Sequence, residues 1–253
     1  MLIAANYHYV RPRFDSPHPG VFGVTADGFA DQIAALGRAG EFVGAAEIRA
    51  AAAGVRRLPE RAIVITFDDG LREHYEVAWQ ILRSRSIPAI MFVNTRPIAE
   101  QIVCTVHKIH LLRSAMPSSA LWQLIESTAQ ELGIPLDCEL DEANMRAQYP
   151  FDDETGAKLK YLLNFGLGIA DRARLMDACF RTCFGAAEHE VSRNLYLTRQ
   201  QIRELGSHDA IGTHGHDHVP LALLEHAERE NSSGRSVHLL AEWMGGQAPV
   251  AIS

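Results

Sequence analysis

The segment Ala62–Gly70, with the sequence AIVITFDDG, places the strongest constraint on how this chain folds. The residues before the two acids are apolar or β-branched and show little alternation, which is typical of a strand covered on both faces. The strand ends in Asp68 and Asp69, followed by Gly70, which permits a tight turn. Two adjacent carboxylates repel each other and do not help a core. We therefore expect them to serve chemistry at the end of a buried strand.

The elements around this strand predict a β-α-β unit. Residues 71–86 have apolar positions at helical spacing, and Pro88 ends the helix before a second buried strand over 89–94. Residues 1–10 read as an earlier strand. This order favours a parallel sheet or barrel, whose functional end is the carboxyl end of the strands. Successive side chains of a strand point in opposite directions, so one acid could bind a metal while the other accepts a proton.

A long central region interrupts the α/β order. Residues 95–196 contain several helical patterns and no pair of strands, which predicts a helical insertion between an α/β part at 1–94 and its continuation at 197–253. The insertion could be a lid, a substrate wall or a dimer surface. A third strand is expected at 210–216, followed by a helical stretch over 221–243.

The third strand ends in the sequence GTHGHDHVPL, which contains three histidines, His214, His216 and His218. Three imidazoles this close would repel one another if protonated, whereas a divalent cation binds neutral imidazole well. His214 and His218 with one aspartate would form a ligand set of two histidines and one carboxylate with open positions, as in catalytic rather than structural sites. His216 is expected to be a neighbour of the site. The alternative, that His216 is itself a metal ligand, stays open.

Composition narrows the class of partner. The chain has 253 residues, 47% hydrophobic and 22% charged, with a net charge of −7. The negative charge argues against nucleic acid or an anionic membrane surface as the main partner. No apolar run is long enough to span a membrane, and the first residues lack the pattern of a signal peptide. These features predict a cytoplasmic protein.

Because its two motifs occur in the order found there, the sequence resembles the polysaccharide deacetylase family, also called the NodB-homology domain or carbohydrate esterase family four. The resemblance lies in TFDDG and in GTHGHDHVPL, with support from NYHYV and FADQIAALGRAG near the start. It covers residues 1 to about 94 and 197–253. It implies a distorted (β/α) barrel with fewer regular units than the eight-fold barrel, and an N-acetylated carbohydrate as substrate.

The resemblance also implies the role of each site residue. Asp68 would be the general base, and Asp69, His214 and His218 would bind the metal. Zinc is the expected metal, and cobalt, nickel or iron would suit the same ligands. A water on the metal would lose its proton to Asp68 and attack the N-acetyl carbonyl, and acetate and a free amine would leave. His8 matches a family position near the barrel mouth, and both a role near the site and simple packing remain open for it.

Three later motifs of the family are not found in this sequence. Members continue with a motif like Tyr-Pro-x-Gly or Arg-x-Pro-Tyr, then an acidic-aromatic motif and a Leu-x-His motif, and none of these follows here. The histidine that would protonate the leaving amine and one backbone amide of the oxyanion site are therefore missing. We expect a barrel that is incomplete at the C-terminus, whose open edges a second copy of the chain or the insertion could cover.

Three functions remain compatible with the sequence. The first is a metal-dependent hydrolase that removes N-acetyl groups from a sugar or polysaccharide. The second keeps the same site but acts as a deformylase or on cyclic amides. The third is a catalytically impaired module that binds metal and sugar.

Overall fold

A computed structural model describes residues 1–14, 21, 23–136, 142–185 and 187–251. The chain forms two compact units. The first contains the described residues of 1–14, 23–102 and 189–251, and the second contains the described residues of 103–188 together with Val21. None of the described helices is long and apolar enough to cross a membrane.

A parallel sheet lies at the centre of the first unit. Its strands are β1 (Leu2–Tyr7), β5 (Ala62–Phe67), β6 (Ala89–Val93) and β7 (Ile211–Thr213), paired in the order β1-β5-β6-β7. The short strand β4 (Glu41–Phe42) pairs with the beginning of β5. Every pairing is parallel, so the carboxyl ends of these strands meet at one edge of the sheet. A separate parallel pair joins β2 (Val10–Arg11) and β3 (Val24–Thr25).

Strand β5 is the centre of this sheet because both of its faces are covered. All of its residues are buried, as the uninterrupted apolar run predicts. Phe67, at its end, packs with Tyr7 of β1 and Phe29, with ring centroids 5.6 Å and 5.8 Å from that of Phe67. Tyr7 and Phe29 meet edge to face at 4.9 Å. This aromatic cluster fixes the strand directly beneath the two acids.

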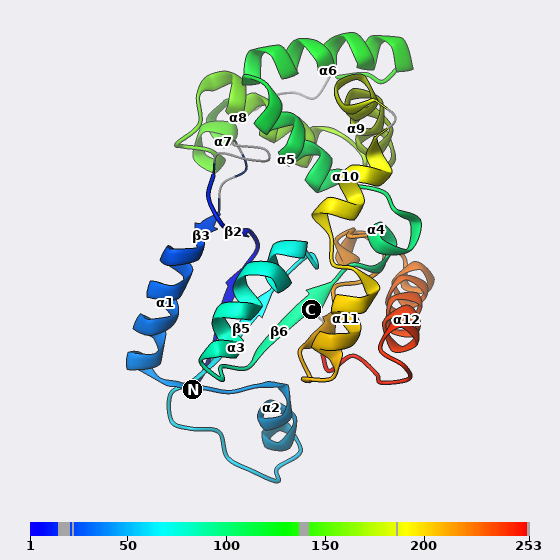
Figure 1. The fold of residues 1–253 in the computed structure, drawn as a ribbon. Coiled ribbons are helices and arrows are strands. Elements are labelled where there is room, and N and C mark those ends of the chain that lie inside the picture. Colours follow the sequence, from blue (N-terminus) through cyan, green and yellow to red (C-terminus); the bar gives the residue numbers. More distant parts are fainter. Residues whose placement is uncertain (15–20, 22, 137–141, 186, 252–253) are drawn as a thin grey trace. The chain divides into compact units, whose positions relative to one another are not determined.

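Helices cover the sheet of the first unit. In Figure 1, α3 (Gln80–Ser84) crosses in front of β5 and β6, while α11 (Arg199–Gly206) and α12 (His226–Trp243) lie close together beside the sheet. Thr25 caps the first helix, since its side chain accepts a hydrogen bond from the Gly28 N–H. The helices are α1 (Ala26–Ala39), α2 (Ala45–Ala52), α3 (Gln80–Ser84), α4 (Thr95–Glu100), α11 (Arg199–Gly206) and α12 (His226–Trp243), with a 3-10 turn at Leu221–Leu223.

The helix expected over 71–86 has an unusual first part. Residues His74–Trp79 form a π-helix, and α3 continues it as an ordinary helix. Short π segments are rare and are frequently found at functional sites. This one places the His74 side chain completely out of solvent.

The second unit is helical. Its helices are α5 (Thr105–Ala115), α6 (Ser118–Leu132), α7 (Glu142–Gln148), α8 (Glu154–Tyr161) and α9 (Ile169–Phe184), with a π turn at Leu162–Gly166; α10 (Glu188–Leu195) leads back to the first unit. Helix α9 packs on α5 and α6. Lys108 is buried there, and its ammonium lies 2.6 Å from Asp177 and 2.7 Å from Glu188. Two carboxylates beside this ammonium offset the cost of its burial.

The described part of the predicted insertion is mainly helical, although its boundaries differ from those of the compact unit. Helix α4 was expected within the insertion at 95–196, yet it packs against α12 of the first unit. The division of the chain into domains at 94 and 196 stays a prediction. The strand expected at 210–216 is shorter, because the chain leaves the sheet after Thr213 and turns at Gly215.

Candidate active site

The two acids lie in a tight turn at the end of β5, here called the carboxylate turn (residues 66–70). Asp69 has a φ of 79° and Gly70 a φ of 64°. Aspartate tolerates this left-handed region better than most residues, and glycine adopts it freely. A Cβ on Gly70 would lie 2.9 Å from Val93 Cγ1, so the turn also needs glycine for space. Segment 196–197 supports the turn, since the Leu197 N–H donates to the Gly70 carbonyl.

Asp69 points toward two histidines from another strand end. It is buried, with 3% of its surface exposed. Its Oδ1 lies 2.8 Å from His218 Nε2 and 3.7 Å from His214 Nε2. One ligand atom from each of the three residues lies within 4.8 Å of the others. The structure therefore brings together the three residues that the sequence proposes as metal ligands.

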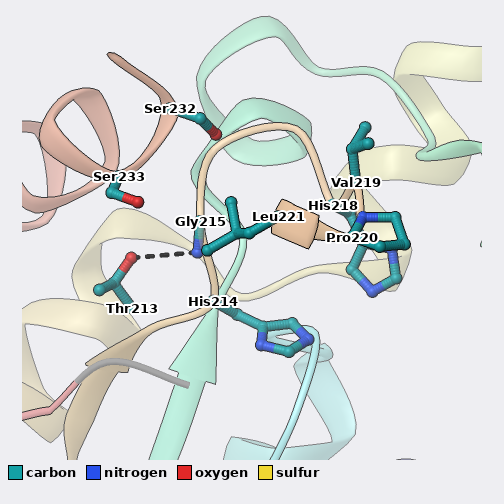
Figure 2. Close-up of a pocket in the computed structure, with 9 residues that line it drawn as sticks. All are labelled: Thr213, His214, Gly215, His218, Val219, Pro220, Leu221, Ser232 and Ser233. Atoms are coloured by element: carbon teal, nitrogen blue, oxygen red, sulfur yellow. Dashed lines mark hydrogen bonds between the residues drawn. The ribbon is translucent and has the colours of Figure 1, made fainter. Parts of the chain in front are cut away.

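Both histidines lie on the segment after β7, here called the histidine loop (residues 213–218) and shown in Figure 2. The loop reverses direction at Gly215, with a φ of 78°, and again at His218, with a φ of 54°. The Gly215 N–H donates to the Thr213 hydroxyl at 3.2 Å. These turns bring both imidazoles to the side of Asp69, with their ring centroids 5.4 Å apart.

Asp68 points elsewhere, as the alternation of a strand requires. Its Oδ2 accepts a hydrogen bond from Asn6 Nδ2 at 2.7 Å. The Thr66 hydroxyl donates to Asn6 Oδ1 at 2.9 Å. The imidazole Nε2 of His8 lies 3.8 Å from the same Asp68 oxygen. The side chain of His8 is 54% exposed, so the structure supports its place near the site and not the alternative of packing.

A buried histidine lies behind the carboxylate turn. His74 Nε2 contacts the carbonyl of His8 at 2.5 Å, and its ring lies 5.0 Å from that of Phe67. Burial lowers the pKa of His74 to about 4, against the opposing effects of the His8 carbonyl and the charge of Asp69. At neutral pH His74 is therefore an uncharged donor that fixes the backbone of His8.

The middle histidine of the motif points away from the other two. His216 is buried, and its Nδ1 lies 2.8 Å from the hydroxyl of Thr95 at the start of α4. Its neighbour Asp217 accepts a hydrogen bond from Arg96 at 3.2 Å. His216 is thus a neighbour of the three-residue group and not part of it, in agreement with the preferred expectation.

A pocket of about 230 Å³ adjoins the histidine loop. Figure 2 shows that it lies between this loop and the beginning of α12, with apolar side chains on one side and serine hydroxyls on the other. Its lining residues are Thr213, His214, Gly215, His218, Val219, Pro220, Leu221, Ser232 and Ser233. The pocket places a small, mostly apolar space beside the residues proposed to bind the metal.

The chemistry of the three residues fits a divalent cation. Two imidazole nitrogens and one carboxylate oxygen are the donors of many catalytic zinc sites. Burial lowers the pKa of His214, with the Asp68 carboxylate opposing this effect. Lowering that pKa favours the neutral imidazole, which is the form that binds metals.

Sequence reasoning missed several residues around the site. Asn6 was assigned only to the first strand and to the segment NYHYV, without a role of its own, and Thr95 only to the insertion. Both residues come near the site through contacts between distant segments, which the sequence does not reveal. Asn6 lies opposite Thr66 in the pairing of β1 with β5, and Thr95 contacts the histidine loop. A polar residue near the predicted end of a parallel strand was the available signal for Asn6. For Thr95 the signal was its place just after a predicted strand.

Comparison with known proteins finds a matching family model and solved structures with a similar fold. The family model described as polysaccharide deacetylase matches residues 56–131, which include both acids of the carboxylate turn. The curated proteins contain no match to this sequence.

Three solved structures resemble the whole chain. The deacetylase PplD from Streptococcus pyogenes, in complex with acetate, is 14% identical, with a TM-score of 0.52 over 99% of this chain and 71% of that one. IcaB from Ammonifex degensii is 19% identical, with a TM-score of 0.50 over 96% and 70%. A de-N-acetylase from Aggregatibacter actinomycetemcomitans is 16% identical, with a TM-score of 0.51 over 98% and 76%.

At such identities the structural likeness concerns the fold alone. It confirms the predicted α/β fold of the NodB type, in which the chain shows a parallel sheet with helices on its faces. The family match confirms the resemblance drawn from TFDDG, and with it the expectation of a hydrolase that acts on carbon–nitrogen bonds other than peptide bonds. Residues 56–131 thus match the polysaccharide deacetylase family model, and the whole chain shares the fold of solved deacetylases.

Proposed function

We propose that this protein removes N-acetyl groups from a carbohydrate, using a divalent metal ion held by Asp69, His214 and His218. The family match and the fold support the reaction class. The three convergent ligand atoms support the metal. Zinc is the first choice, because a carboxylate and two imidazoles suit it well, and cobalt, nickel or iron would fit the same set.

One observation carries this proposal more than any other. The two adjacent acids have different partners: Asp69 contacts both histidines, whereas Asp68 contacts Asn6 and approaches His8. Strand alternation turns the two side chains apart, and the resulting division brings two histidines from another strand end to Asp69 alone. A hydrolase needs it, because one carboxylate must hold the metal while the other stays available to accept a proton.

Each residue then has a separate task. A divalent metal, when bound, supplies an electrophile that polarises the acetyl carbonyl and acidifies water. Asp68 accepts a proton through Oδ1, because Oδ2 is already engaged by Asn6. Water that has given its proton to Asp68 would add its oxygen to the acetyl carbon, the bond from that carbon to the sugar nitrogen would break, and the proton would pass to the nitrogen, so that acetate and a free amine leave. The half-exposed His8 lies beside Asp68, where substrate would reach it.

The test combines metal binding with acetate release. The purified protein is freed of metal, titrated with zinc by calorimetry, and assayed for acetate with N-acetylated chitooligosaccharides. Asp68→Asn should keep zinc affinity within about three-fold of the unchanged protein and lower turnover by about 10²-fold or more. Asp69→Asn should lose most zinc binding as well as turnover, since it removes the charged ligand. Asp31→Asn, at an exposed position of α1 away from the group, is the control.

The outcomes separate the three functions. Zinc binding with acetate release supports the proposal. Zinc binding with turnover only on formylated or cyclic amides favours the second reading, and zinc binding without turnover favours a binding module. If Asp68→Asn lost the metal while Asp69→Asn kept it, the two roles would have to be exchanged.

A further inference from the structure

The residues that separate His214 from His218 form a buried network of polar contacts with the segment after β6. The Asn94 side chain donates to the His214 carbonyl at 2.5 Å. The Thr95 N–H donates to the Gly215 carbonyl at 3.3 Å. The Arg96 N–H donates to the His216 carbonyl at 3.0 Å. Three consecutive residues thus bind three consecutive carbonyls of the histidine loop.

The centre of this network is the contact between Thr95 and His216. Both side chains are almost fully buried, with 0% and 2% of their surface exposed. The other ring nitrogen, His216 Nε2, faces the carboxylate of Glu100 at 3.8 Å. An ionised carboxylate favours a proton on the nitrogen that faces it, so Nδ1 is the acceptor and the Thr95 hydroxyl the donor. The charge of Glu100 is itself maintained by Arg96, which lowers the pKa of that carboxyl.

The loop is held from its other side by α12. The His216 N–H donates to the Ser232 hydroxyl at 3.2 Å. The hydroxyls of Thr213 and Ser236 lie 2.6 Å apart. His216 is therefore attached by its ring to α4 and by its backbone to α12, while the flanking His214 and His218 turn toward Asp69.

We propose that His216 is a positioning residue that, through Thr95, holds the histidine loop so that His214 and His218 converge on one metal ion. This inference rests on the metal site of the proposed function and assigns a role to the one histidine of the motif that does not contact Asp69. Residues that orient metal ligands typically change metal affinity by 10- to 100-fold when altered.

The experiment measures zinc affinity by competition with a chromophoric chelator. Thr95→Val keeps the shape of the side chain but removes the donor, and it should weaken zinc binding by about 10- to 100-fold. Thr95→Ser keeps the hydroxyl and should stay within about three-fold of the unchanged protein. The matched control is Thr128→Val, which also removes a hydroxyl from a buried threonine, in the second unit. Apo-protein melting temperatures are recorded for every variant, so that loss of stability is measured separately from loss of affinity.

Each result either supports or overturns the positioning role of His216. Weaker zinc binding in Thr95→Val alone, restored in Thr95→Ser, supports the role of His216. An unchanged affinity in Thr95→Val overturns it, and so does an equal loss in Thr128→Val, which would reflect stability alone. His216→Asn gives a second reading of the same contact and should weaken zinc binding at least as much as Thr95→Val. A wild-type protein that binds no zinc overturns the proposed metal site, and this inference with it.

Discussion

The carboxylate turn and the histidine loop meet at one point, yet they are supported in different ways. The carboxylate turn follows the longest buried strand and leaves it in two residues, Asp69 and Gly70, with positive φ. Its polar support, Asn6, is exposed to solvent. The histidine loop follows a short strand, β7, and its polar support at Asn94, Thr95 and His216 is buried.

This difference shows what fixes the positions of the side chains in each half of the site. A central strand already fixes the direction of its last side chains, so Asp69 needs little more than a tight turn. A loop that reverses direction twice has no such template, and buried hydrogen bonds must supply it, since buried polar groups without partners are costly.

A first prediction concerns His74, whose ring contacts the His8 carbonyl and packs on Phe67 at the end of β5. Its pKa is about 4 in the folded protein, below the ordinary value of 6.5, because burial disfavours the charged ring. Between these values the unfolded chain binds a proton that the folded protein does not. The free energy of unfolding should therefore fall as the pH falls from about 6.5 to 4, by at most about 3 kcal/mol from this residue.

The check is urea denaturation of the metal-free protein at several pH values in this window. His74→Gln keeps a donor for the His8 carbonyl but does not titrate, so its stability should depend less steeply on pH. The other histidines act in both proteins, and the difference between the two curves belongs to His74. Identical slopes would show that the turn does not depend on a neutral His74.

A second prediction compares one glycine from each half. Gly70→Ala adds a Cβ 2.9 Å from Val93 Cγ1 and 3.3 Å from Val93 Cα, whereas Gly215→Ala finds only Ser232 Oγ at 3.8 Å. Both positions have positive φ, which costs alanine about 1–2 kcal/mol. Crowding adds about 1–3 kcal/mol for Gly70 alone. Denaturation of the two metal-free variants should show Gly70→Ala as clearly less stable, and equal losses would contradict the view that only the carboxylate turn is packed against a neighbour.

The smallest expected effect concerns Asn6. Because this support is exposed, its hydrogen bond to Asp68 is worth only about 0.5–1 kcal/mol. Asn6→Ala should lower kcat for acetate release by about two- to five-fold, while zinc affinity stays unchanged because Asp69 is not involved. Asn144→Ala, on the exposed part of the second unit, serves as the control. A loss of zinc affinity in Asn6→Ala would mean that the two acids are not supported independently.

Much of the first half of the site follows from local sequence. An uninterrupted apolar run, two acids and a glycine are enough to predict a buried strand, its functional end and two carboxylates that point apart, and the structure agrees at Ala62–Gly70. The segment 210–216 predicted another strand that ends in histidines in the same way, although the observed strand is shorter. Both inferences succeed because the alternation of side chains and the turn preference of glycine are properties of the chain over a few residues.

The remainder required contacts between distant segments. That Asn6 lies beside Asp68 depends on the register of β1 against β5, and that Thr95 bonds His216 depends on where α4 packs. The π-helix at His74–Trp79 likewise looked like an ordinary helix in sequence.

By itself, then, the sequence determined which residues could form the site and at which end of the strands they would stand. Tertiary structure alone decided that His214 and His218 face Asp69 while His216 turns to Thr95. The physical reason is that helix and strand periodicity act over neighbouring residues, whereas the partner of a buried polar group is set by packing across the whole fold.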